Sequence, residues 1–280
     1  MTDLRLTERA GDEERLAHQA MDDGVHTLVV CGGDGTWGKV AGAVVGGSSP
    51  GTDLPTGASA APPLRLAFLS AGTGNDFAKN LRAPTSDPAA MARMISEGAL
   101  ERLVDMGRVD DRLFLNVAGF GFDVAVLRSS DGDRWLRGPA LYVATAVQEL
   151  FSFEGIECRV CLDASDLLAP WTRRLLMVFA NGAHFGGAFR VAPDAVVDDG
   201  ALDAIIVGDT ARWRRAPLLG RVLRGTHLAD ALVQHARGER FTVAFREPPW
   251  FEADGDLHRA AMPECEVHVI RGALRVLDAP

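Results

Sequence analysis

The sequence predicts an α/β fold in its first third and a β-rich fold in the remainder. Two nearly all-apolar stretches, residues 25–30 and 64–69, each run into a glycine-rich segment that opens a helical pattern. Such apolar strands are typical of a parallel sheet that is covered on both faces. Beyond residue 103 the pattern changes to a succession of short strands. Because α/β units followed by a run of strands indicate two domains, we expect an α/β domain over 1–103 and a β-rich domain over 104–280, whose last strand could return to the first.

The composition is that of a globular protein that can bury a large core. Of the 280 residues, 47% are hydrophobic and 24% are charged, and the formal net charge is −9. This charge argues against nucleic acid as the main partner, because binding to phosphate backbones needs a basic surface. No signal peptide is recognisable, and no apolar run is long enough to span a bilayer. We therefore expect a soluble, cytoplasmic protein.

Two of the four cysteines, Cys158 and Cys161, form a CxxC pair of the kind that begins many zinc and redox sites. No second such pair follows, and the two cysteines lie in a strand-like stretch, residues 156–162. Side chains three residues apart on a strand point to opposite faces. The pattern therefore favours a structural strand over a metal site, and free thiols suit a reducing compartment.

In the first domain, residue spacing predicts alternating helices and strands. Residues 12–23 place apolar side chains at helical spacing, and Gly24 ends this helix. The strand at 25–30 leads through a glycine-rich turn into a helix over 37–45. Residues 46–63 are rich in Gly, Ser, Thr, Ala and Pro, which predicts a flexible surface loop. After it we expect a strand at 64–69, a second glycine loop that opens a helix, and a helix over 88–97 that Gly98 closes.

In the second domain, the first two strands are expected to form a hairpin. They occupy residues 103–109 and 112–117 and flank the turn at Asp110 and Asp111. Further strands are predicted at 157–162, 174–180, 202–207, 241–245 and 264–270, with helices at 139–151 and about 212–223.

The first glycine loop, residues 32–36 (Gly-Gly-Asp-Gly-Thr), links an apolar strand to a helix. Its glycines allow positive φ and let the backbone approach a ligand closely. A loop at a strand end that faces a helix N-terminus offers backbone N–H groups to a phosphate. A tight turn without a ligand would show the same pattern, so the loop alone leaves both interpretations open.

The second glycine loop, residues 72–76 (Gly-Thr-Gly-Asn-Asp), also follows an apolar strand. Two such loops would lie side by side at the carboxyl edge of one parallel sheet, where open α/β folds bind ligands. The first loop contains Asp34, while Asn75, Asp76 and nearby Lys79 belong to the second. Carboxylates beside a phosphate make sense if Mg²⁺ bridges them or if they bind a ribose hydroxyl, because they otherwise repel the phosphate.

The two loops belong to an ordered set of short motifs. They extend to VVCGGDGT at 29–36 and GTGNDFA at 72–78. Together these segments resemble the paired motifs of the diacylglycerol kinase catalytic family, which includes bacterial lipid kinases and the sphingosine and ceramide kinases. The resemblance covers about residues 7–277 and begins after the family's first strand and Asn-Pro loop, which the chain is expected to lack. Further matches in order are VDMG at 104–107, NVAGFGFD at 116–123, FGG at 185–187, APDA at 192–195, DGALD at 199–203 and DGD at 254–256.

The resemblance implies an ATP-dependent lipid kinase of phospholipid biosynthesis, with an α/β nucleotide-binding domain followed by a β-sandwich lipid-binding domain. The γ-phosphate of ATP would pass to the hydroxyl of diacylglycerol or a related lipid alcohol. Asp254 would be the general base, and Asp256 stands where the family usually has glutamate. By motif match, the expected nucleotide-binding residues are Gly32, Gly33, Asp34, Gly35, Thr36, Gly72, Thr73, Asn75, Asp76, Lys79 and Asp256, and the expected Mg²⁺ ligands are Asp76, Asp105, Asp199 and Asp203.

Two segments could contact lipid. Residues 139–153 carry a broad apolar face that could line an acyl cleft or pack in the core. Residues 212–224 mix arginines with Trp213 and aliphatic side chains, which suits either an interfacial helix on anionic lipid or a solvated basic face. For a lipid kinase we expect transient peripheral contact with the anionic inner face of a membrane. The net charge already argues against nucleic acid as a partner, and a homodimer stays open.

Two alternative functions stand beside the lipid kinase. An NAD kinase-type phosphotransferase also uses a Gly-Gly-Asp-Gly loop, but it would not be expected to show the second loop or the DGD motif at 254–256. A catalytically impaired lipid- or nucleotide-binding protein would keep the motifs without the activity, and the expected lack of the first strand suggests it.

Overall fold

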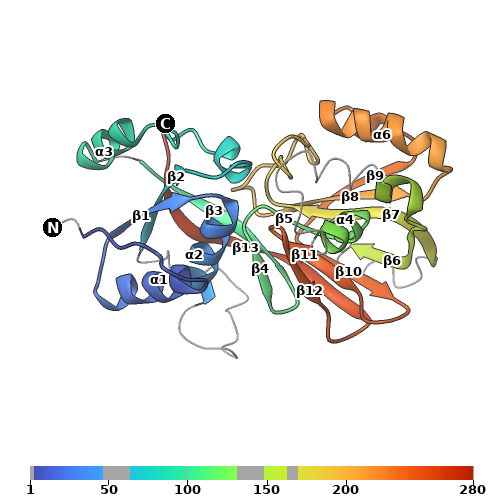
Figure 1. The fold of residues 1–280 in the computed structure, drawn as a ribbon, viewed down its shortest axis with the longest axis horizontal. Helices are drawn as coiled ribbons and strands as arrows, with labels where there is room; N and C mark the ends of the chain where they lie inside the picture. Colours follow the sequence, from blue (N-terminus) through green and yellow to red (C-terminus); the bar gives the residue numbers. More distant parts are fainter. Residues whose placement is uncertain (1–2, 47–63, 99, 131–147, 163–169, 280) are drawn as a thin grey trace.

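The computed structural model describes residues 3–46, 64–98, 100–130, 148–162 and 170–279. It shows a half in which helices flank the sheet and a β-rich half beside it (Figure 1). Within the described ranges, the strands form one hydrogen-bonded network. The predicted α/β fold class with a β-rich second part is therefore confirmed. No helix in the described part of the chain is both long and apolar enough to cross a bilayer.

In the helix-flanked half, strands β1 and β2 are parallel. They pair in register up to Gly32, which lies opposite Ser70. Because both strands run in the same direction, both glycine loops leave the sheet at the same edge, as the sequence predicts. The elements of this half are α1 (Asp12–Asp22), β1 (Thr27–Gly32), α2 (Asp34–Gly46), β2 (Arg65–Ser70), η1 (Phe77–Asn80) and α3 (Pro88–Ser96).

The helix expected after the second glycine loop is shorter than predicted. Only the 3₁₀ turn η1 forms there, and Leu81 after it is already extended. The loop that precedes it contains Asn75 at φ 48°, and the N–H of Phe77 goes to the side chain of Asp34. This N–H joins the second loop to the first, and the helical turn that follows it ends at Asn80.

The β-rich half contains more short elements than the sequence predicts. Strands β5, β9, β11 and β12 and helix α4 were not expected as separate elements. Most of the helix predicted over 139–151 and most of the loop at 46–63 lie outside the described residues. The elements are β3 (Glu101–Val109), β4 (Arg112–Phe114), β5 (Val117–Gly121), α4 (Phe122–Ser130), β6 (Ile156–Leu162), β7 (Thr172–Ala180), β8 (Leu202–Gly208), α6 (Arg212–Arg224), η2 (His227–Ala229), β9 (Val233–Gly238), β10 (Arg240–Phe245), β11 (Trp250–Ala253) and β12 (Asp256–Arg259).

The strand predicted over 112–117 is interrupted, which corrects that prediction. β4 ends at Phe114, and β5 begins at Val117. The backbone N–H groups of Leu115, Asn116 and Val117 all donate to the carboxylate of Asp254. These amides are therefore directed to a side chain and are not part of a strand ladder at this point.

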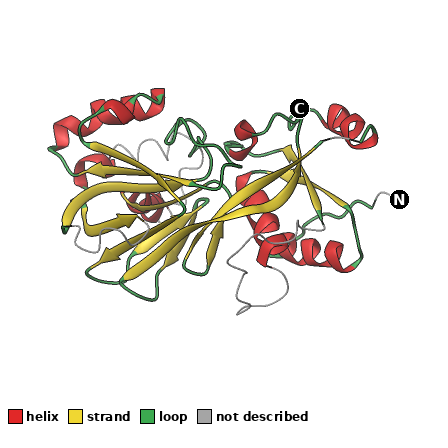
Figure 2. Cartoon of the chain, turned by 180° about the vertical axis from the view of Figure 1, so that it is seen from behind, coloured by secondary structure: helices red, strands yellow, loops and turns green. Residues whose placement is uncertain are grey.

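The last strand, β13 (Glu264–Leu277), runs through both halves (Figures 1 and 2). Its first part pairs with β10, and its end pairs in parallel with β2 through Arg275 and Val276. β3 lies antiparallel along most of it, with an irregularity between Ile270 and Leu274. The predicted domain boundary near residue 103 falls within β3, and we keep it as a proposal.

Separate clusters of buried side chains stabilise the two halves. In the helix-flanked half, Trp37 of α2 and Phe68 of β2 are buried with ring centroids 4.8 Å apart. In the β-rich half, Phe120, Phe179 and Phe241 belong to a second cluster between the strands. Cys158 is buried in that same cluster on β6, so the predicted strand at the CxxC pair is confirmed.

Candidate active site

The two glycine loops are in direct backbone contact. Ala71 donates its N–H to the carbonyl of Gly32 at 2.8 Å. A Cβ placed on Gly72 would lie 2.5 Å from Cα of Gly33, and a Cβ on Gly33 would lie 3.0 Å from Cα of Gly72. Because side-chain carbons do not approach backbone atoms this closely, glycine at these positions is required by the close approach of the loops.

Asp34, the first residue of α2, links the first loop to the second. Its Oδ1 accepts the N–H of Phe77 at 3.0 Å. A Cβ on Gly74 would lie 3.2 Å from Oδ2 of Asp34 and 3.4 Å from Oδ2 of Asp76. The two carboxylates therefore face the same small space beside Gly74, next to the positive end of the α2 dipole.

Asp76 connects the second loop to the β-rich half. Its Oδ1 lies 2.6 Å from Nζ of Lys79, and its Oδ2 accepts the N–H of Gly187 at 2.9 Å. Lys79 also donates to the carbonyl of Gly187 at 2.7 Å. Gly187 has φ 79°, which glycine adopts readily. The FGG motif noted in the sequence thus meets the second glycine loop across the boundary between the halves.

The other residues expected to bind nucleotide lie in or next to these loops. Asn75 closes the second loop on itself, because it donates to the carbonyl of Gly72 at 2.8 Å and accepts the N–H of Gly72 at 3.0 Å. A Cβ on Gly32 would come within 2.7 Å of the Thr36 side chain. Gly35 and Thr36 lie in the first turn of α2, and Thr73 lies in the second loop.

Asp254 approaches α2, the helix that follows the first glycine loop, from the β-rich half. It lies in the turn between β11 and β12 at φ 49°, followed by Gly255 at φ 89°. Its Oδ2 accepts the N–H of Leu115 at 2.5 Å, and its Oδ1 accepts those of Asn116 and Val117 at 2.9 and 3.1 Å. The turn and the three amides fix this carboxylate in one orientation.

The carboxylate of Asp254 faces the start of α2. A Cβ on Gly38 would lie 3.2 Å from its Oδ2. Burial raises the pKa of Asp254 to about 6, and the negative charge of Asp34 adds to the shift, whereas the three backbone N–H donors oppose it. Asp254 is thus ionised at neutral pH, with a proton affinity above that of an ordinary aspartate.

A second carboxyl group, Glu252 on β11, was not singled out from the sequence. It is fully buried next to Asp123 of α4, which is 5% exposed. A Cβ on Gly119 would overlap Oδ2 of Asp123 and lie 3.0 Å from Oε1 of Glu252, and neither oxygen has a hydrogen-bond partner among the described residues. Burial raises the pKa of both carboxyl groups, and the charge of Asp123 raises that of Glu252 further. The only sequence signal was an acidic residue within the apolar strand that precedes Asp254.

Replacing Glu252 by glutamine is expected to stabilise the protein at pH 8 by roughly 1–3 kcal/mol, the usual cost of leaving a buried polar group without a partner. The folded state holds protons on this pair more tightly than the unfolded chain does, so stability falls as the pH rises above the usual carboxyl range. The glutamine removes one charge, keeps an acceptor for the N–H of Gly255, and can donate to Asp123. Thermal unfolding at pH 8 and pH 4.5 measures the effect.

The matched control is Glu247→Gln, because Glu247 is exposed. It should leave the unfolding temperature unchanged at both pH values. If Glu252→Gln gave no gain at pH 8, or the same gain at both pH values, repulsion within the buried pair would be excluded.

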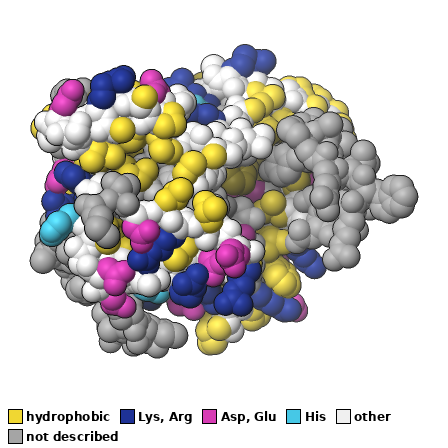
Figure 3. All heavy atoms as spheres, turned by 60° about the vertical axis from the view of Figure 1, so that its left-hand side comes forward, with side chains coloured by type: hydrophobic (Ala, Val, Ile, Leu, Met, Phe, Trp, Pro, Cys, Tyr) yellow, Lys and Arg dark blue, Asp and Glu magenta, His cyan; other side chains and the backbone are white. Residues whose placement is uncertain are grey.

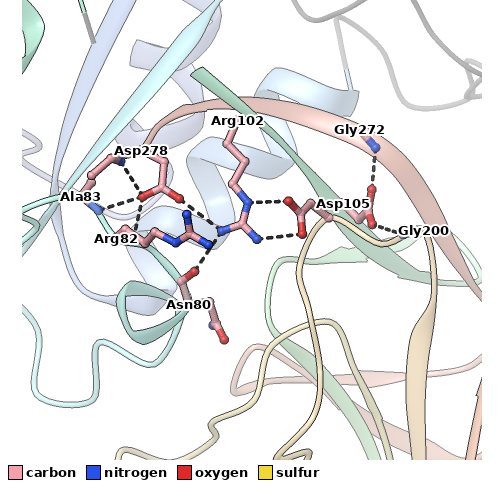
Figure 4. A network of polar contacts seen from close by, with 10 residues as sticks. Asn80, Arg82, Ala83, Arg102, Asp105, Gly200, Gly272 and Asp278 are labelled. Carbon is pink, nitrogen blue, oxygen red and sulfur yellow. Dashed lines mark hydrogen bonds and ion pairs between the residues drawn. The ribbon is translucent and has the colours of Figure 1, made fainter. Parts of the chain in front are cut away.

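Asp105, an expected Mg²⁺ ligand, lies in a network that joins the two halves (Figure 4). Its Oδ2 accepts the N–H of Gly200 and its Oδ1 that of Gly272, both at 2.7 Å. In the same region Arg102 lies 3.2 Å from Asp278, whose Oδ1 accepts the backbone N–H groups of Arg82 and Ala83. Both oxygens of Asp105 thus accept backbone amides of the β-rich half and of β13.

Asp199 and Asp203, two further expected Mg²⁺ ligands, contact side chains of β9. Asp199 pairs with Arg237, and Oδ1 of Asp203 lies 2.5 Å from Nε2 of His235. Asp256 is exposed at the start of β12. Among the described residues, no three His, Cys, Asp or Glu side chains form a cluster that could hold a metal ion by themselves. The metal-binding roles of these residues therefore stay predictions.

An apolar cavity of about 80 Å³ lies between α4, α6 and the sheet. Its wall includes Val126 of α4, Leu175 and Val178 of β7, and Leu218 and Val222 of α6. Asp123 also lines it. Asp123 of this cavity lies next to Glu252 of β11, the strand that precedes Asp254, so an apolar site and an acidic site lie close together.

Two family models together match most of the chain. The model described as "Diacylglycerol kinase catalytic domain" matches residues 1–109, and the one described as "YegS C-terminal NAD kinase beta sandwich-like domain" matches residues 116–278. The first match contains both glycine loops, and the second contains Glu252 and Asp254.

Similar proteins match over nearly the whole chain. A diacylglycerol kinase of Mycobacterium tuberculosis is 29% identical over 96% of this chain and 82% of its own length. A protein of Xanthomonas euvesicatoria named "Probable lipid kinase YegS-like" is 30% identical over 91% of this chain and 80% of its own length. A protein of the same name from Pseudomonas aeruginosa is 32% identical over 90% of this chain and 73% of its own length. A crystal structure of a diacylglycerol kinase from Bacillus anthracis superposes on this chain with a TM-score of 0.70 at 19% identity. The superposition covers 98% of this chain and 84% of that one, so the two proteins share a fold. This chain therefore belongs to the diacylglycerol kinase catalytic-domain family, and its second half is a YegS-type β-sandwich-like domain.

Proposed function

We propose that this protein is an ATP-dependent lipid kinase that transfers the γ-phosphate of ATP to the hydroxyl of a lipid alcohol. The observation that carries the proposal is the convergence of the two glycine loops with Asp254. Gly33 and Gly72 are in backbone contact, and the Asp254 carboxylate lies against α2 at Gly38. A phosphate-binding backbone and a carboxylate of raised proton affinity are the parts that phosphoryl transfer to an alcohol needs.

In this proposal Asp254 accepts the proton of the lipid hydroxyl. The hydroxyl oxygen forms a bond to the γ-phosphorus, the bond from that phosphorus to the β-phosphate oxygen breaks, and the products are ADP and a lipid phosphate. A carboxylate offers about four acceptor positions, and three of those on Asp254 are taken by backbone N–H groups. The remaining position would receive the proton, and the three donors keep the carboxylate ionised until then.

The glycine loops would hold the phosphates of ATP. Backbone N–H groups at the start of α2 can donate to them, because no residue of the first helical turn has an intrahelical acceptor for its N–H. Asp34 and Asp76 face one space beside Gly74. This fits Mg²⁺, which is often bound by one or two carboxylates together with substrate phosphates and water. When bound, Mg²⁺ would neutralise charge on the phosphoryl oxygens.

The lipid would be bound by the β-rich half. The cavity beside Leu175, Val178, Leu218 and Val222 offers an apolar surface close to the acidic pair and Asp254. We propose that the protein meets its lipid in transient contact with an anionic membrane and not with nucleic acid. On the face drawn in Figure 3, basic and acidic side chains are interspersed, which does not suit the continuous basic surface that a phosphate backbone requires.

The proposal predicts that the purified protein transfers radiolabel from [γ-³²P]ATP to a component of a mixed lipid extract. The labelled product should partition into organic solvent, and chelation of Mg²⁺ with EDTA should abolish labelling. The same protein is incubated in parallel with NAD in place of lipid. Labelling of NAD instead of lipid would establish the rival phosphotransferase, and no labelling of lipid by folded protein would overturn the kinase proposal.

A further inference from the structure

Helix α6 lies at the outer edge of the β-rich half (Figure 1) and exposes an unusual set of side chains. Trp213 is 74% exposed and Leu223 is 46% exposed. Arg212 and Arg214 flank the tryptophan and are exposed as well. A large aromatic side chain that remains in water between two cations is typical of surfaces that enter the headgroup region of a bilayer.

The outer face of α6 is basic in a protein of net charge −9. The helix contains five arginines and no acidic residue. Arg221 pairs with Asp230 at 2.6 Å, and Arg224 is exposed in the last turn. The arginines that flank Trp213 are thus part of a local positive surface, which can attract an anionic bilayer despite the overall negative charge of the protein.

The inner face of the same helix closes the apolar cavity. Leu218, Leu219 and Val222 line the cavity, and Leu218 is 4% exposed. One helix therefore separates the cavity from the outside, with apolar side chains inward and with Trp213 and its two flanking arginines outward. A membrane bound to the outer face would lie one helix diameter from the cavity, about 10 Å.

A buried arginine fixes α6 in this orientation. Arg215 is 4% exposed and lies 2.8 Å from Oδ1 of Asp209. It also donates to the carbonyls of Leu150, Phe153 and Thr210 at 2.9, 2.7 and 3.1 Å. These contacts of Arg215 hold the inner face of α6 against the rest of the protein. The two arginines that flank Trp213 therefore remain on the outer face and are not needed to keep the helix in place.

We propose that the outer face of α6, with Arg212, Trp213 and Arg214 at its centre, docks the protein on an anionic lipid bilayer. The arginines contact lipid phosphates, and the indole enters the headgroup region. The docked surface lies next to the cavity that would take the acyl part of the substrate. The role of this surface, to bring the enzyme to its lipid, rests on the proposed function. Membrane binding itself can be measured without any kinase reaction.

The test is co-sedimentation of the whole protein with vesicles. Vesicles of phosphatidylcholine with 30 mol% phosphatidylglycerol should bind it, and vesicles of phosphatidylcholine alone should bind much less. The variant Arg212→Glu/Arg214→Glu should bind the anionic vesicles at least about 25-fold more weakly, at about fivefold for each arginine. Trp213→Ala should weaken binding to both kinds of vesicle, and high salt should weaken the charge-dependent part.

The matched control is Arg93→Glu, an exposed arginine on α3 in the other half. It changes the net charge but should leave vesicle binding within about twofold of wild type. Equal binding by the wild type and the double variant, or no binding by the wild type, would overturn the docking surface. Kinase activity on a short-chain lipid dispersed in detergent separates the two proposals, because this assay needs no membrane. The double variant should keep this activity. Its absence from the wild type would count against the proposed function and not against the docking surface.

Discussion

Replacing Asp254 by asparagine is expected to lower the rate of lipid phosphorylation by about 10²- to 10⁴-fold, the usual contribution of a general base. The variant can no longer take the proton of the lipid hydroxyl. Because the pKa of Asp254 lies at about 6, the wild-type rate should fall as the pH drops below 6 and reach a plateau above pH 7. Initial rates with radiolabelled ATP from pH 5 to pH 8.5 measure both effects.

The controls for Asp254→Asn follow from its three N–H donors. The NH₂ group of an asparagine would replace one of the two carboxylate oxygens. In one orientation it would face the N–H of Leu115, and in the other it would face the N–H groups of Asn116 and Val117. This mismatch should cost roughly 1–3 kcal/mol of stability, so thermal unfolding must be measured and the assay run well below the transition. ATP affinity should stay within a few-fold of wild type. Undiminished phosphorylation, or a variant whose rate still follows a pKa near 6, would remove Asp254 as the base.

Replacing Gly72 by alanine is expected to lower kcat/KM for ATP by about 10²-fold or more. The new Cβ would lie 2.5 Å from Cα of Gly33 and 3.0 Å from Oδ1 of Asn75, so the two loops would have to move apart. Displacements on the order of 1 Å in a phosphoryl-transfer site can reduce the rate about 10²-fold, because positioning supplies much of the acceleration. Steady-state kinetics with varied ATP measure the loss.

Gly42→Ala provides the matched control for this substitution. Gly42 lies within α2, and a Cβ there meets no atom of another described residue within 4 Å. Alanine should therefore leave ATP kinetics unchanged and stabilise the helix by about 0.5–1 kcal/mol. If both alanine variants retained normal kinetics for ATP, close contact between the loops would not matter for nucleotide binding.

The sequence predicted the arrangement of the glycine loops because their signals are local. Each loop follows an apolar strand, and parallel strands end at the same edge of a sheet. The contact between Gly33 and Gly72, the bond from Phe77 to Asp34 and the approach of Gly187 to Asp76 all extend that prediction. The sequence thus predicted that the two loops lie side by side, whereas the contact of Gly187 with Asp76 is known only from the structure.

Features that depend on distant partners were not predictable in the same way. The strand over 112–117 is broken by the Asp254 carboxylate, which comes from a turn far along the chain. Asp105 binds the backbone of Gly200 and Gly272, contacts that depend on where those segments fold. Glu252 gave almost no signal, because its partner Asp123 is brought to it only by the packing of α4 on the sheet. Such contacts require the tertiary fold itself.

The path of β13 has a consequence for how the protein folds. The helix-flanked half is complete only when Arg275 and Val276 pair with Arg65 and Leu66, after the whole β-rich half has been traversed. Contacts between residues so distant in sequence form late, because the entropy of closing a long loop is lost before the pairing is gained. We therefore expect the two halves to acquire their stability together, in one cooperative and slow refolding step.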